Sequence, residues 1–64
     1  MCESNAYIVR DGKEELVFED VASMEPRGED NLLLKGILGN PLEIKARLLK
    51  MDFMAHKILL EEIK

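Results

Sequence analysis

The feature that most constrains this fold is a short chain with a single cysteine. The 64 residues contain only Cys2, so no disulfide can form within the chain. A domain of this size buries a small core, is marginally stable alone, and usually gains stability from a disulfide, a metal or a partner subunit. We therefore expect one domain spanning residues 1–64, supported by a metal ion or by a second copy of itself.

The clearest local signal is a β-hairpin near the amino end. Asp11-Gly12 is a dipeptide preferred in two-residue hairpin turns, because both positions tolerate a positive φ. A plausible strand precedes it at 4–10, with Ala6 and Ile8 on one face and Tyr7 and Val9 on the other, and an apolar run follows it at 16–18. These residues predict two antiparallel strands joined by a tight turn.

Two further apolar runs are bounded by turn residues. The segment 21–25 is expected to be a short third strand that ends at Pro26, with a turn over 26–30. The segment 32–34 is expected to be a buried strand, followed by another turn at 36–41.

The last third of the chain fits two structures. From Leu42 to Leu48, apolar and charged residues alternate as in a half-buried strand. An apolar residue also recurs every three or four positions from Ile44 to Ile58, as on one face of an amphipathic helix. Good helix formers dominate this segment. The residues alone therefore leave strand and helix open.

Charge and hydropathy argue against two classes of partner. The chain has 13 acidic and 9 basic residues, interspersed, and a net charge of −4. Binding to a phosphate backbone needs clustered cations, so we expect no nucleic acid partner. The best basic cluster has no aromatic residue interleaved with it and consists of Lys45, Arg47, Lys50 and Lys57. No run of 18 apolar residues exists, so we expect no membrane span.

The residues that enzymes commonly use are mostly missing. With one histidine, one cysteine and two serines, the chain has no Ser/His/Asp set, no metal-binding HExxH, no CxxC and no glycine-rich phosphate loop. A chain of this size also builds no deep pocket to shift carboxylate pKa values. We expect a protein that is not an enzyme.

Cys2 is the residue best suited to chemistry. Removal of Met1 would leave the Cys2 thiolate beside a free α-amine, and the Glu3 backbone amide could add a second nitrogen. Nitrogen and sulfur donors in a planar set suit Ni(II) and Cu(II), whereas Zn(II) prefers a tetrahedral site. Two other readings of Cys2 stay open: an unconstrained thiol, and an amino-terminal nucleophile or redox group.

His56 is the other borderline metal donor. A single histidine in a Met-Ala-His-Lys context is more often a loop or strand-edge residue than a ligand. We keep it as a weaker candidate ligand. The lone thiol and the absence of a secretory apolar segment favour a reducing cytoplasm.

Several segments together match one known family. The matching segments are 1–7 (MCESNAY), 11–15 (DGKEE), Asp20-Val21, Pro26-x-Gly28, Leu32-x-Leu34, Leu38-Gly39 and 51–58 (MDFMAHKI). With these segments the chain resembles the CooT family over nearly its whole length.

The resemblance implies both a fold and a function. CooT-like proteins are small dimeric nickel-binding proteins, in some organisms accessories to nickel insertion into carbon monoxide dehydrogenase. The implied fold is a mostly β barrel or sandwich of about six short antiparallel strands, with strand at 42–48 and 57–61.

The resemblance also implies a site. It makes Cys2 the Ni(II) ligand, shared across a homodimer and completed by an amino-terminal or backbone nitrogen. The client would be a nickel enzyme such as carbon monoxide dehydrogenase. Related chains have also been catalogued as predicted RNA-binding proteins, so the alternative is a small RNA- or protein-binding module in which Cys2 is incidental.

Overall fold

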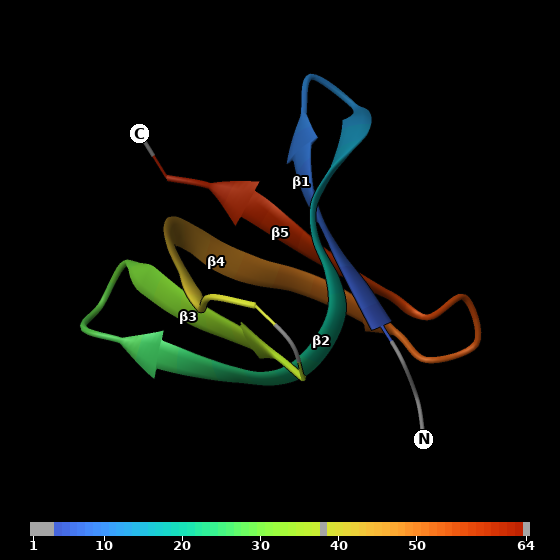
Figure 1. The fold of residues 1–64 in the computed structure, drawn as a ribbon. Helices are drawn as coiled ribbons and strands as arrows, with labels where there is room; N and C mark the ends of the chain where they lie inside the picture. The colour runs from blue at the N-terminus through green and yellow to red at the C-terminus, as the bar shows by residue number, and fades with distance from the viewer. Residues whose placement is uncertain (1–3, 38, 64) are drawn as a thin grey trace.

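The computed structural model describes residues 4–37 and 39–63, which form five β-strands in a closed barrel (Figure 1). The strands are β1 (Ser4–Arg10), β2 (Lys13–Arg27), β3 (Asn31–Gly36), β4 (Leu42–Asp52) and β5 (Lys57–Glu62). Consecutive strands pair antiparallel, and β5 closes the barrel by pairing parallel to β1. The expected mostly β fold is confirmed, with five strands in the described chain where about six antiparallel ones were expected.

The predicted hairpin is confirmed. β1 ends at Arg10, which lies opposite Lys13 at the start of β2. Asp11 and Gly12 between them have φ values of 50° and 77°. Two consecutive positive φ angles are the backbone of a two-residue hairpin turn, and aspartate and glycine reach them at little cost.

The two strands expected at 16–18 and 21–25 are one strand, β2. Its pairing with β1 is irregular around Ala6, and Asp20 there has a φ of 53°. Such an irregularity bends a strand without ending it. The first half of β2 therefore pairs with β1 and the second half with β3.

Pro26 does not end β2. The strand continues to Arg27, and Pro26 lies opposite Leu32 of β3. By this point β2 has left β1, so β3 is its strand neighbour in the described chain. Proline is tolerated in such an edge position because its missing N–H can face away from the ladder.

The segment that fitted both strand and helix is strand. β4 pairs with β3 through 42–45 and with β5 through 46–52, and β5 follows after a turn at 53–56. The Ala55 N–H donates to Asp52 Oδ1 at 3.0 Å in this turn. Across the residues that the structure describes, no helix is long and apolar enough to cross a membrane.

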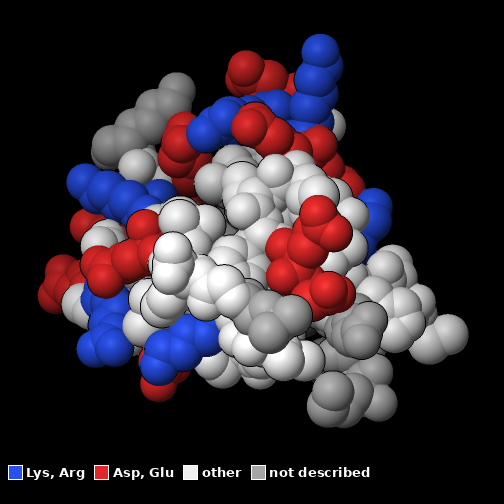
Figure 2. All heavy atoms as spheres, in the orientation of Figure 1, with Lys and Arg blue, Asp and Glu red and all other residues white. Residues whose placement is uncertain are grey.

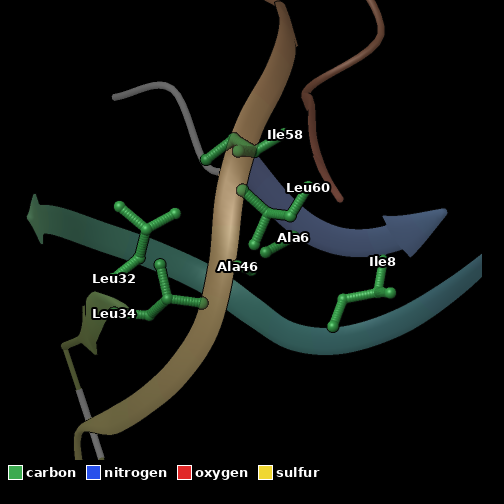
Figure 3. Close-up of a cluster of buried hydrophobic side chains, with 7 residues drawn as sticks. All are labelled: Ala6, Ile8, Leu32, Leu34, Ala46, Ile58 and Leu60. Carbon is green, nitrogen blue, oxygen red and sulfur yellow. The ribbon is translucent and has the colours of Figure 1, made fainter. Parts of the chain in front are cut away.

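Seven apolar side chains fill the barrel (Figure 3). They come from β1, β3, β4 and β5 and are Ala6, Ile8, Leu32, Leu34, Ala46, Ile58 and Leu60. Leu34 and Leu60 are the largest fully buried side chains among the described residues. Ala6 and Ile8, which were expected to share one face of β1, are both buried in this core.

Candidate functional site

The sequence predicts a metal site at the amino end of the chain. The predicted ligands Cys2 and Glu3 lie outside the described residues. The described chain begins at Ser4, so the site is characterised here by the groups that surround the start of β1.

Two hydrogen bonds fix the start of β1. The Asn5 N–H donates to the carbonyl oxygen of His56 at 3.0 Å. The Asp20 N–H donates to the side-chain Oδ1 of Asn5 at 3.1 Å. In the parallel register Asn5 lies opposite Lys57. The start of β1 is therefore held between β2 and the turn from β4 to β5 (Figure 1).

Both partners of Asn5 have a left-handed backbone. The φ values are 53° at Asp20 and 55° at His56. Aspartate and histidine are among the few residue types enriched in this region, where other side chains are strained. Each residue uses this conformation to present a backbone group to Asn5.

The anchoring roles of Asn5 and Asp20 were not predicted from the sequence. One signal for Asp20 was present, because the acidic pair Glu19-Asp20 interrupts the apolar run between Phe18 and Val21. Such a break can mark a bulge as well as a turn. Nothing in the sequence indicates the partner of Asn5, since His56 meets it through the pairing of β1 with β5.

His56 lies beside the chain that leads to Cys2. It is an exposed residue at the end of the β4–β5 turn. Three peptide units connect Cys2 to Asn5, which limits the distance between their Cα atoms to about 11 Å. Within residues 4–37 and 39–63, no three His, Cys, Asp or Glu side chains are grouped to hold a metal ion. The described residues thus offer no metal site complete in itself.

Basic side chains around β4 and β5 are paired with carboxylates. The pairs are Lys57–Glu14 at 2.9 Å, Arg47–Glu61 at 3.6 Å and Lys50–Asp52 at 4.0 Å. The hydrogen bond that Lys57 donates to the Glu14 carboxylate raises the pKa of Lys57, whose Nζ also lies 5.3 Å from the centre of the Tyr7 ring. Figure 2 shows acidic and basic groups interspersed over the visible face. In the described part of the chain, the cations around β4 and β5 are interspersed with carboxylates, whereas binding to a phosphate backbone needs clustered cations.

A second charged group lies at the far end of β1. Arg10 donates to both carboxylate oxygens of Glu62, at 3.2 and 2.6 Å, and to Glu15 at 2.7 Å. The hydrogen bond to Glu62 is the main cause of a raised pKa at Arg10. These groups tie β1, β2 and β5 together at the end opposite the amino terminus.

One depression in the described surface carries little chemistry. It is an open hollow of about 370 Å³ lined by Leu16, Val17, Phe18, Glu19 and Asn40. Glu19 is the one titratable side chain in this lining. General acid–base or nucleophilic catalysis needs at least two such groups within hydrogen-bond reach. The hollow therefore holds no catalytic pair.

Comparison with known proteins gives one family and one close structure. The model of a family described as the CO dehydrogenase accessory protein CooT matches residues 1–61. A crystal structure of a protein assigned as CooT from Carboxydothermus hydrogenoformans is similar, with 41% identity and a TM-score of 0.88. That alignment covers 98% of this chain and 100% of the other. A comparison with curated proteins gives no match.

Proposed function

Because the chain belongs to the CooT family of carbon monoxide dehydrogenase accessory proteins, we propose that it is a nickel-binding protein. In this proposal it holds or delivers Ni(II) during maturation of a nickel enzyme such as carbon monoxide dehydrogenase. The observation that carries the proposal is the family match over residues 1–61, a range that includes Cys2. The protein acts without catalysis of its own, in a reducing cytoplasm where a lone thiol persists.

The donor chemistry of the amino end suits this cargo. A Cys2 thiolate with a nitrogen from the amino terminus or from the Glu3 backbone amide forms a small chelate. Nitrogen and thiolate donors in one plane match the preference of Ni(II). A single chain contributes a single sulfur. Two chains related by a two-fold axis contribute two thiolates and two nitrogens, which completes a four-coordinate site.

The described structure supports a site at the amino end. A ligand near a chain terminus is useful only if the chain that carries it leaves the domain at a defined point. Asn5 supplies that point, because its backbone is bonded to His56 and its side chain to Asp20. The residues before Ser4 thus start from a fixed place on the barrel.

The best basic cluster in the described residues does not favour the alternative of an RNA-binding module. Three of the four residues in the best basic cluster are already paired with carboxylates, namely Arg47, Lys50 and Lys57. Single-stranded RNA is usually bound by basic grooves with exposed aromatic side chains. A nickel carrier fits the family match and the donor chemistry of Cys2, and unlike an RNA-binding module it needs no basic groove with exposed aromatic side chains.

Titration with Ni(II) tests the proposal. Ligation by a thiolate gives sulfur-to-metal charge-transfer bands in the near ultraviolet, which should grow with added nickel and saturate. Cys2→Ser should abolish the bands and the tight binding. Glu3→Gln is the matched control, because it changes the side chain and keeps the backbone amide, and should bind nickel as the wild type does. Equal binding by Cys2→Ser would overturn the proposal.

A further inference from the structure

The first half of β2 has a strand neighbour on only one side in the described chain. β2 pairs with β1 through 13–21 and with β3 through 21–27, and it bends between the two pairings (Figure 1). From 13 to 19, β1 lies on one side, and the other side is open within the described residues. The N–H and C=O groups that point away from a ladder are available to an added strand. We call residues 13–19 the β2 open edge.

The open hollow lies along the β2 open edge. Among the described residues, it is lined by four consecutive residues of the edge, Leu16 to Glu19, and by Asn40 from the connection between β3 and β4. Leu16 is 45% exposed, whereas Val17 and Phe18 are partly buried against the core. The volume of about 370 Å³ is large enough for a bound group. Because the hollow is open to solvent, it suits a side chain of a segment that continues past it.

The charges along this part of β2 are mostly acidic. Four of the eight residues at 13–20 are acidic and one is basic. The two acidic residues nearest the hairpin turn form ion pairs with Lys57 and Arg10. Glu19 and Asp20 are exposed, and within the described chain neither carboxylate forms an ion pair. A partner that covers the hollow therefore has to match exposed carboxylates, which lysine or arginine does.

We propose that the β2 open edge binds an extended basic segment of a partner protein as an added strand. An apolar side chain of that segment occupies the hollow, and a lysine or arginine lies beside Glu19. In strand addition, main-chain hydrogen bonds supply affinity, and pockets for individual side chains supply specificity. The edge and the hollow beside it provide one of each.

A second copy of this chain fits the edge poorly. Two copies paired antiparallel about Val17 would place Glu15 opposite Glu19 and Glu14 opposite Asp20 across the pair. Like charges directly opposite each other destabilise paired strands. The edge therefore selects a partner of opposite charge over another copy of itself.

Nuclear magnetic resonance of the full chain with a probe peptide tests the proposal. The probe is a blocked eight-residue peptide, Lys-Lys-Val-Val repeated, in which each face of an extended strand carries both basic and apolar side chains. The backbone amides of 13–19 should shift on titration. Alternate amides among them should gain protection from hydrogen exchange, because they donate to the added strand. Peptides with glutamate for lysine, or with serine for valine, should bind about tenfold more weakly or less.

Two charge reversals locate the site. Glu19→Lys places a like charge beside the hollow and should weaken binding of the probe by about tenfold or more. Glu29→Lys is the matched control, because Glu29 is an exposed residue in the turn between β2 and β3 and the net charge changes by the same amount. It should bind within about twofold of the wild type, since exposed charges beyond the screening length act weakly. Both side chains are exposed, so both variants should keep the fold, which far-UV circular dichroism verifies.

The results separate strand addition from its alternatives. No amide shift at millimolar peptide overturns the proposal, as does equal weakening by the two charge reversals, which shows a general charge effect. Shifts without new protection at 13–19 also overturn strand addition. Shifts at 13–19 that grow with protein concentration without peptide show that a second copy covers the edge, and they overturn the proposal as well. The experiment contains no metal, so none of these results bears on the proposed nickel binding.

Discussion

Leu60 lies at the centre of the barrel and is fully buried. It is opposite Ile8 on β1 and Leu48 on β4. Replacing it with alanine deletes three carbon atoms from a core of seven buried apolar side chains within the described chain. Two of those seven are already alanines, Ala6 and Ala46.

The expected loss is large for a domain of this size. Three methylene-sized groups contribute about 2.4 kcal/mol of transfer free energy, and an unfilled cavity brings typical buried Leu→Ala changes to about 3 kcal/mol or more. At 0.05–0.15 kcal/mol per residue, a domain of this length has roughly 3–10 kcal/mol of unfolding free energy in total. Leu60→Ala should therefore remove a third or more of the stability.

Urea denaturation followed by far-UV circular dichroism measures this loss. With a slope of about 1 kcal/mol per molar urea, the midpoint should fall by about 3 M, or the variant should be unfolded without denaturant. Leu16→Ala is the control, because Leu16 is 45% exposed and should lose only about 1 kcal/mol. All proteins are compared at one chain concentration, so that association between chains does not enter the comparison. Equal losses from the two substitutions would refute this description of the core.

Three further predictions concern the site and its surroundings. His56→Ala should keep the wild-type nickel stoichiometry in equilibrium dialysis, because the described role of His56 is a hydrogen bond through its backbone carbonyl. A loss of bound nickel as complete as that from Cys2→Ser would make His56 a ligand. The raised pKa of Lys57 means that its pairing with Glu14 stabilises the fold fully below pH 10.5 and is lost as pH rises through the raised value. Thermal melts from pH 9 to 12 should therefore show a smaller decline for Lys57→Gln than for the wild type, and parallel declines would contradict this. RNA mobility shifts should be absent at micromolar protein, and a shift that weakens steeply with salt would favour an RNA-binding module.

Local chemistry was enough to predict the hairpin and too little to predict the course of β2. The turn depends only on the adjacent residues Asp11 and Gly12, which both adopt a positive φ. The hairpin can therefore be predicted from the sequence. The continuity of β2 depends on an irregularity at Asp20, which is stabilised by Asn5 from another strand. A contact of this kind leaves no periodic pattern in the sequence.

The choice between strand and helix after Leu42 also depended on distant residues. Helical and strand spacing both fit the apolar positions, and helix propensity is a weak preference that tertiary context overrides. β4 is a strand because β3 and β5 pair with its two halves. The exposure of Phe53 and Met54 could not be predicted from the sequence either, because an apolar residue near a turn is normally assigned to the core.

The candidate site was only partly accessible from the sequence. Cys2 stands out by its chemistry and by the family resemblance, and its role as a ligand stays a prediction. The position of His56 next to the start of β1 could not be foreseen, because it arises from the parallel pairing that closes the barrel. A parallel pair joins segments that are far apart in the chain and has no local signature.

The number of nickel ions per chain tests the central claim, a metal site shared by two chains, most directly. Native mass spectrometry of protein loaded with Ni(II) resolves each assembly with its metal. The shared site predicts one nickel ion per two chains for the wild type, and a metal-free dimer for Cys2→Ser. One nickel ion per chain, bound with full affinity by the monomer, would contradict the claim and place the metal on a single amino end.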